Sequence, residues 1–330
     1  MEQNIYNKLH ADGLISDESF EKVKQAHTNR LFSVHWELKT LLYLGVMLLS
    51  GGLGTLVYKN IDTIGHQVIL AFIALISIGC FTYCFKNRPL FSTGKVKAPN
   101  TGFDYILLLG SISMVTFLGY LQFKYNVFGT NYGMATFIPT VALFFIAYYF
   151  DHLGILSMAI ASLGLWMGVS VTPKTLLAYD TFNNKDIIFT YVLFGLLLLA
   201  AGYLSGLLKI KKHFKFSYHH YGVHVTFIAL LAGFFEYNNT GYAYLWLLAA
   251  LGLAVYVYFD GFKEHSFYFV LLSILYGYFA FCCLMVKFVT GFDSNEGVFE
   301  LLLLLFIFSA VALVYLIIHA NRQIKADDHL

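Results

Sequence analysis

The stretch that decides the fold is residues 41–58, LLYLGVMLLSGGLGTLVY, an uncharged apolar run that follows a charged N-terminal segment. A helix rises about 1.5 Å per residue, so a hydrocarbon layer of about 30 Å needs about 20 residues. Nine later runs have a similar length and lack the polar–apolar alternation of barrel strands. The sequence therefore predicts an all-α, polytopic membrane protein with ten spans. These are residues 41–58, 67–85, 103–123, 132–150, 153–171, 187–208, 221–237, 242–259, 267–288 and 298–319.

The composition agrees with a membrane setting. Hydrophobic residues make up 58% of the chain and charged residues 12%, about half the charged share of an ordinary soluble domain. A soluble core cannot absorb that surplus of apolar side chains. Membrane lipid is the expected partner, and no nucleic-acid partner is expected.

The basic residues predict an orientation. If the N-terminus is cytoplasmic and the ten spans alternate, sixteen of the 21 lysines and arginines fall inside and five fall outside. Cytoplasmic loops carry an excess of basic residues, so this distribution places both termini in the cytoplasm. The first apolar run starts too late, and is too long, for a cleavable signal peptide.

An internal repeat is predicted from matching helix ends. Residues 149–151 and 258–260 both read YFD and lie 109 residues apart, each before a short cytoplasmic turn. Two parallel copies of a four-helix unit are therefore expected, at residues 103–215 and 216–320, with Asp151 and Asp260 at equivalent turns. Alternatively, any two blocks of four alternating helices resemble each other and the YFD match is fortuitous. The other expected parts are residues 40–102, which hold two helices and a basic loop, and a cytoplasmic tail at 321–330.

The N-terminal segment, residues 1–39, is expected to form a cytoplasmic helical hairpin. Gly13 suits the left-handed end of a first helix, and Ser16 suits the N-cap of a second. The hairpin is too small for a core of its own. It therefore packs on the membrane domain, self-associates or binds a partner.

A candidate path for a solute is predicted around Pro139, the one proline inside a predicted helix. Proline leaves the carbonyl of residue 135 without its helical donor, and in a bilayer such a group persists only inside protein or beside water. Thr136 and Thr140 lie on either side of it. The carboxylates of Glu236 and Glu300, near the predicted outer face, form an entrance for cations or are simply solvated at the interface.

Histidines gather at positions 213, 219, 220 and 224. The i, i+4 spacing of His220 and His224 suits a metal, yet there is no HExxH pattern and no nearby carboxylate to complete a site. A basic patch against anionic lipid is the favoured interpretation. No catalytic residue, metal site or cofactor site is predicted.

A resemblance rests on two stretches. The segment L-x-x-x-G-L-I-S at residues 9–16 and the first span, LLYLGVMLLSGGLG, resemble the bacterial predicted membrane proteins grouped as domain of unknown function 2157. The resemblance implies a bacterial inner-membrane setting. It carries no activity, since none is established for that group.

Two functions remain open from the sequence. The first is a translocator or channel for a small solute or lipid, by analogy with transporters built from parallel repeats. The alternative is a non-transporting scaffold or sensor that binds a partner through residues 1–39. A membrane-embedded enzyme comes third, because no paired acids, metal set or activated nucleophile is visible.

Overall fold

The computed structural model describes residues 10, 12–28, 65–129, 132–171, 185–290 and 297–327, with separate positions between 41 and 59. The chain forms two compact units, Met1–Ile69 and Leu70–Leu330. Most of the predicted first span, 41–58, and of the predicted hairpin, 1–39, lies outside the described residues.

The described part of the first unit is built on helix α2 (Asp17–Thr28). Ser16 caps the helix, because its Oγ accepts a hydrogen bond from the backbone N–H of Ser19 at 3.3 Å. Gly13 has φ +70°, in the left-handed region that glycine adopts readily. Both local predictions are confirmed.

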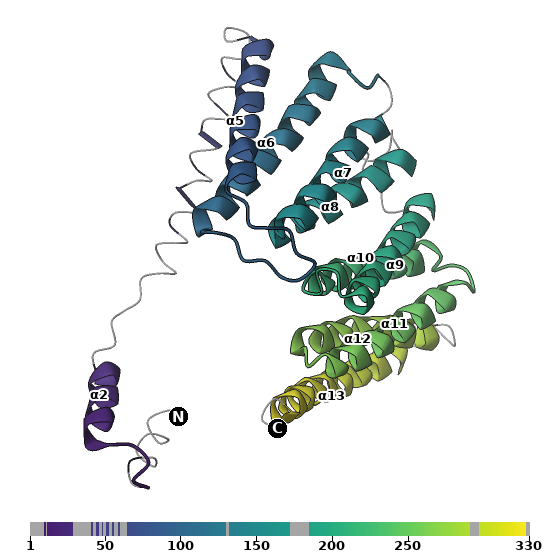
Figure 1. Cartoon of the computed structure of the whole chain (residues 1–330). Coiled ribbons are helices and arrows are strands. Elements are labelled where there is room, and N and C mark those ends of the chain that lie inside the picture. Colours follow the sequence, from purple (N-terminus) through teal and green to yellow (C-terminus); the bar gives the residue numbers. More distant parts are fainter. Residues whose placement is uncertain are drawn as a thin grey trace. The chain divides into compact units, whose positions relative to one another are not determined.

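The second unit consists of long helices (Figure 1). Its order begins with α5 (His66–Lys86), whose first residues belong to the first unit, followed by α6 (Thr101–Tyr125), α7 (Tyr132–Phe150), α8 (Leu153–Val171) and α9 (Lys185–Leu208). Then come α10 (Phe214–Glu236), α11 (Ala243–Lys263), α12 (Phe267–Thr290) and α13 (Gly297–Asp327). The described residues contain no strand. Successive helices pair side by side as α7 with α8, α9 with α10 and α11 with α12.

Eight helices within the described residues are long and apolar enough to cross a membrane: α5, α6, α7, α8, α9, α11, α12 and α13. The all-helical membrane architecture is thus confirmed, whereas the count of ten spans is not. Helix α10 is 23 residues long but begins at Phe214 with FKFSYHHYGVH, too polar to qualify.

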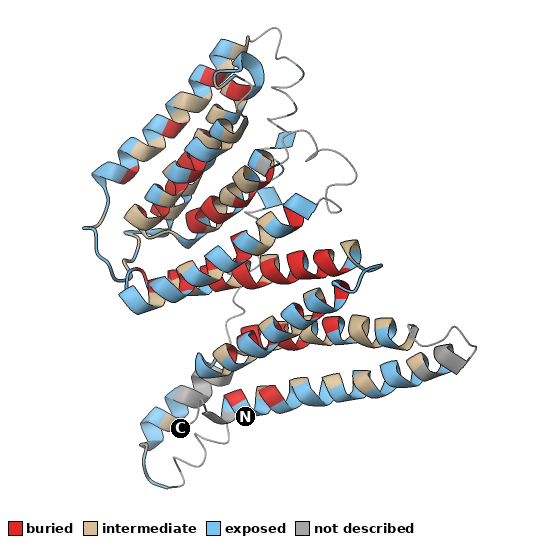
Figure 2. Ribbon diagram, turned by 90° about the vertical axis from the view of Figure 1, so that its right-hand side faces the viewer, coloured by how far each residue is buried: buried red, intermediate tan, exposed pale blue. Residues whose placement is uncertain are grey.

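Helix α10 is nevertheless the most enclosed helix of the second unit, packing against α8, α9, α11 and α12 (Figure 2). Its approach to α9 depends on glycine. A Cβ on Gly195 would clash with the side chain and backbone of Thr226, and one on Gly222 would lie 3.0 Å from the backbone nitrogen of Leu199. Small residues thus allow close backbone contact, as in other membrane helix pairs.

Four connections of the second unit meet at one end of the helices. The backbone N–H of Val96, in the α5–α6 connection, donates to Asp151 at 2.5 Å, and the N–H of Lys211 donates to Thr93 O at 2.7 Å. Lys215, at the start of α10, bonds Glu264 of the α11–α12 turn at 2.7 Å. We call this the basic-loop end. The contacts agree with the predicted alternation from α5 to α12, while the side of the membrane that this end faces stays a prediction.

Candidate functional site

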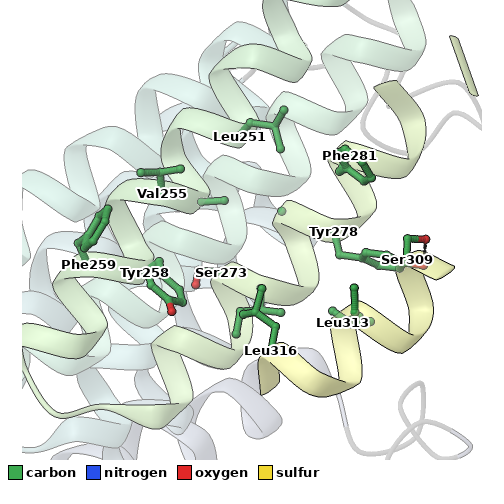
Figure 3. Close-up of a pocket in the computed structure, with 14 residues that line it drawn as sticks. Leu251, Val255, Tyr258, Phe259, Ser273, Tyr278, Phe281, Ser309, Leu313 and Leu316 are labelled. Atoms are coloured by element: carbon green, nitrogen blue, oxygen red, sulfur yellow. Dashed lines mark hydrogen bonds between the residues drawn. The ribbon is translucent and has the colours of Figure 1, made fainter. Parts of the chain in front are cut away.

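A hollow lies between α11, α12 and α13 of the second unit (Figure 3), and we call it the α11–α13 groove. It forms because α13 is anchored to α12 through Ala320 and Ile324, which pack on Val270 and Ile274 near the basic-loop end. Beyond these contacts the facing side chains leave a cavity of about 540 Å³. Its wall is apolar and includes Leu251.

Two further cavities continue the groove along α12. The second has a volume of about 340 Å³ and shares Phe281 and Ser309 with the first. The third, of about 900 Å³, shares Cys282 with the second. On α12 the three cavities extend from Ser273 to Lys287, which is about 21 Å at 1.5 Å per residue. The groove is therefore longer than one leaflet of the hydrocarbon layer, about 15 Å.

Polar groups are few along the groove. Tyr278 on α12 and Ser309 on α13 form a hydrogen bond across it, with 3.1 Å between their oxygen atoms (Figure 3). Ser273 donates to the backbone oxygen of Val270 at 2.7 Å. A largely apolar wall with a few satisfied hydroxyl groups suits hydrocarbon chains better than ions.

The end of the groove away from the basic-loop end is polar, and we call it the mouth. Lys287 Nζ donates to the backbone oxygen of Asn238 and to Asn238 Oδ1, the latter at 3.1 Å. The same nitrogen lies 5.4 Å from the ring centre of Tyr244. Asn239 and Thr240 complete this polar rim. The described residues that line the third cavity include Lys287 and the amide side chains of Asn238 and Asn239.

The predicted path residues are placed elsewhere. Pro139 and Thr140 are buried in the α7–α8 pair, where Thr140 Oγ1 donates to Thr136 O at 2.7 Å and lies 2.6 Å from Ser162 Oγ. Glu236 is half-buried at the end of α10, and Glu300 is exposed in the first turn of α13. Neither carboxylate lines the groove. The path past Pro139 stays a prediction.

Asp151 is the centre of a buried charged cluster at the basic-loop end. Its side chain is 1% exposed, and it follows α7 with φ +60°. One carboxylate oxygen accepts from Val96 N–H at 2.5 Å and lies 3.1 Å from Lys211 Nζ, whose side chain is also 1% exposed. The other lies 2.5 Å from His213 Nε2. The cluster ties the α5–α6 connection, the α7–α8 turn and the α9–α10 turn together.

Beside this cluster, the imidazole of His152 accepts a hydrogen bond from Ile155 N–H at 3.1 Å and so caps α8. Burial lowers the pKa of His152, and the nearby carboxylate of Asp104 opposes that shift. The histidine therefore stays neutral near neutral pH, as the cap requires.

Asp260, the predicted equivalent of Asp151, has a different environment. Its side chain is 26% exposed, and its Oδ2 lies 3.6 Å from His219 Nδ1. In the α11–α12 turn the carboxylate that forms a salt bridge is that of Glu264. Its hydrogen bond to Lys215 lowers the pKa of Glu264, while partial burial opposes the shift.

The backbone hydrogen bonds show which residues of the α7–α8 and α11–α12 turns correspond. His152 N–H donates to Ala147 O at 3.1 Å, and Ser266 N–H donates to Gly261 O at 2.9 Å. In both turns the donor lies five residues after the acceptor, at the end of the helix. This is the long hydrogen bond of a Schellman motif. The position before each donor has a positive φ in both turns.

Those left-handed residues are Asp151, at φ +60°, and His265, at φ +51°. They lie 265 − 151 = 114 residues apart, whereas the YFD match gives 109. Asp260 therefore lies inside α11, five residues before the left-handed position. The duplication is not confirmed and stays a prediction, and the turn geometry favours a register of 114.

The groove was not predicted from the sequence. His220 and His224 form hydrogen bonds with tyrosines of α12, and contact of the histidines with anionic lipid stays a prediction. No group of three or more potential metal ligands occurs among the described histidine, cysteine, aspartate and glutamate residues. The only sequence signal for the mouth was Lys287, counted as one of five basic residues on the outer side.

The eight long apolar helices among the described residues define a multi-pass helical membrane protein. Residues 7–156 match the family described as Predicted membrane protein (DUF2157), which confirms the resemblance seen in the first span. The match ends in α8, before the groove begins. No curated protein and no solved structure matches the chain.

Proposed function

We propose that this protein is a translocator for a lipid-like amphiphile with an anionic head group, held in the α11–α13 groove. The observation that carries the proposal is the change from apolar to polar lining along three neighbouring cavities that share lining residues. Its first cavity, lined by residues such as Leu251 and Phe281, is apolar. Its mouth holds Lys287 beside the amide of Asn238.

The length and opening of the groove support movement of the ligand as well as binding. A groove of about 21 Å along α12 extends beyond one leaflet, so a bound chain reaches past the middle of the membrane. Helix α13 forms its outer wall and contacts the rest of the described second unit mainly through α12. The hydroxyl pair Tyr278–Ser309 offers a polar step at mid-groove for a head group that moves inward.

The proposal is tested with the full chain in vesicles that contain phosphatidylglycerol labelled with a fluorophore reducible from outside. The protein is expected to speed exchange of the labelled lipid between leaflets. Ala312 lines the first and second cavities, and Ala312→Phe fills the groove. This variant should lower the exchange rate about tenfold. Ala310→Phe on the exposed face of the same helix is the matched control and should behave as the unchanged protein.

The same assay separates the groove from the path past Pro139. If the groove is the route, Pro139→Ala combined with Glu300→Gln leaves lipid exchange unchanged. If the solute path is the route, this double variant loses flux while Ala312→Phe retains it. No acceleration of lipid exchange by the unchanged protein would contradict the groove proposal.

A scaffold remains the second candidate, because residues Met1–Ile69 form a compact unit of their own. In that proposal the exposed acidic and basic side chains of α2, including the Glu18–Lys22 pair, serve a protein partner. Deletion of residues 1–39 would then abolish the cellular phenotype, and Ala312→Phe would leave it intact.

A further inference from the structure

A chain of four side chains links α10 and α12 inside the second unit. The hydroxyl of Tyr268 lies 2.6 Å from His220 Nδ1 and 3.1 Å from His224 Nε2. His224 Nδ1 in turn lies 2.8 Å from the hydroxyl of Tyr276. Three hydrogen bonds therefore connect two histidines and two tyrosines without a gap, and we call this arrangement the His–Tyr chain.

The chain has a direction, because a neutral imidazole donates from one ring nitrogen and accepts at the other. If His224 Nε2–H donates to the Tyr268 oxygen, then His224 Nδ1 accepts from Tyr276. The Tyr268 hydroxyl must then donate to His220 Nδ1. Exchanging the tautomers of both histidines reverses all three bonds, so two states of opposite direction share one geometry.

The second feature of the His–Tyr chain is its depth along α10 and α12. His220 lies six residues into α10 and Tyr276 nine residues into α12, or about 9 Å and about 14 Å from the basic-loop end of each helix. Half of the hydrocarbon layer is about 15 Å. By this measure Tyr276 lies near the middle of the membrane, and His220 lies about 5 Å closer to the basic-loop end.

The groups around the His–Tyr chain are an aspartate paired elsewhere and two aromatic rings. Asp260 of α11 is paired with His219, at 3.6 Å, and not with either chain histidine. Phe216 stacks on the ring of His220, and Phe227 stacks on Tyr276 with 4.5 Å between ring centres. Apolar rings therefore flank the two ends. Ionisable groups at this depth are costly and usually belong to ion or proton pathways.

We propose that the His–Tyr chain is a proton relay. A proton that joins the Tyr276 oxygen displaces the Tyr276 proton onto His224 Nδ1, and the proton on His224 Nε2 moves to the Tyr268 oxygen. The Tyr268 proton moves to His220 Nδ1, and the proton on His220 Nε2 leaves toward the basic-loop end. One proton enters, one leaves, and both histidines change tautomer. Rotation of the four groups restores the first state.

Tyr276, the inner end of the relay, lies on the same helix as the mouth of the groove. Cys283, which lines the third cavity, is seven residues beyond Tyr276 on α12, about 10 Å along the helix. The relay does not depend on what the groove carries.

Two measurements test the relay in the full chain. Solid-state nuclear magnetic resonance of ¹⁵N-labelled histidine in bilayers should show His220 and His224 exchanging between both neutral tautomers in the unchanged protein. In Tyr268→Phe the link is broken, and each histidine should settle into one tautomer. A single fixed tautomer in the unchanged protein would mean a static structural network and would overturn the relay.

The second measurement is proton entry into vesicles whose membrane potential is clamped with potassium and valinomycin, followed by a trapped pH-sensitive dye. The unchanged protein should admit protons about tenfold faster than Tyr268→Phe. Tyr203→Phe, on the exposed face of α9, is the control and should match the unchanged protein. Equal rates for the unchanged protein and Tyr268→Phe would overturn the relay and would leave the lipid groove untouched.

Discussion

The α7–α8 turn and the α11–α12 turn each lie near a YFD tripeptide, but the two turns are stabilised in different ways. At the first, Asp151 is 1% exposed and contacts residues of two other segments, the α5–α6 connection and the α9–α10 turn. At the second, Asp260 is 26% exposed, one turn inside its helix, and the nearest salt bridge joins Lys215 to a 44% exposed Glu264. A shared motif at matching helix ends therefore does not imply a shared role. The free-energy cost of changing each turn should differ accordingly.

The largest expected effect is that of Asp151→Ala. Removing the carboxylate leaves the buried ammonium of Lys211 without its counter-charge, which costs about 3–5 kcal/mol. Alanine also tolerates the positive φ poorly. Asp260→Ala, the matched change in the other turn, should cost less than about 1 kcal/mol. Unfolding of both variants in detergent, followed by circular dichroism against denaturant, gives the two values.

Two outcomes would alter this comparison. Equal losses for Asp151→Ala and Asp260→Ala would mean that the two turns are equivalent after all, as the 109-residue match predicts. Near-recovery of stability when Lys211→Met is added to Asp151→Ala would show that the loss arises from the unpaired lysine.

A smaller effect is expected at Gly261, the residue whose carbonyl accepts the turn hydrogen bond. A Cβ there would lie 2.8 Å from Val270 Cγ2 and 3.0 Å from Val270 N, so Gly261→Ala should cost about 1–3 kcal/mol through overpacking. The corresponding residue in the α7–α8 turn is Ala147, fully buried without glycine. Gly252→Ala on the same helix meets nothing within 4 Å and is the control. Thermal unfolding in detergent should show a lower midpoint for Gly261→Ala alone.

These contrasts also show what the sequence can predict. The predicted span 153–171 coincides with α8, and 67–85 differs from α5 by one residue at each end, because apolar length alone sets a spanning helix. The predicted span 221–237 misses the first turns of α10. Its polar side chains are satisfied by neighbouring helices, which a count of apolar residues does not detect.

The candidate site was less predictable than the helices. The groove depends on where α13 separates from α12, and no residue type or spacing marks that separation. Lys287 becomes part of a polar mouth only because folding brings Asn238 beside it. The buried pairing of Asp151 with Lys211 joins residues 60 positions apart, beyond the reach of helical periodicity.

The smallest expected effect is that of Glu264→Gln, which removes the salt bridge of the α11–α12 turn. The hydrogen bond from Lys215 holds the pKa of Glu264 below its ordinary value. A carboxylate with a lowered pKa in the folded state stabilises the protein above its unfolded pKa, about 4.3, and loses that contribution as the pH falls through the folded pKa. Because Glu264 is 44% exposed, solvent screening keeps the contribution below about 1 kcal/mol. Unfolding of the unchanged protein and the variant in detergent should therefore differ slightly near neutral pH and converge in acid, and the difference should shrink in high salt. A difference that instead grew as the pH fell would mean that the protonated carboxyl group, rather than the ion pair, stabilises this turn.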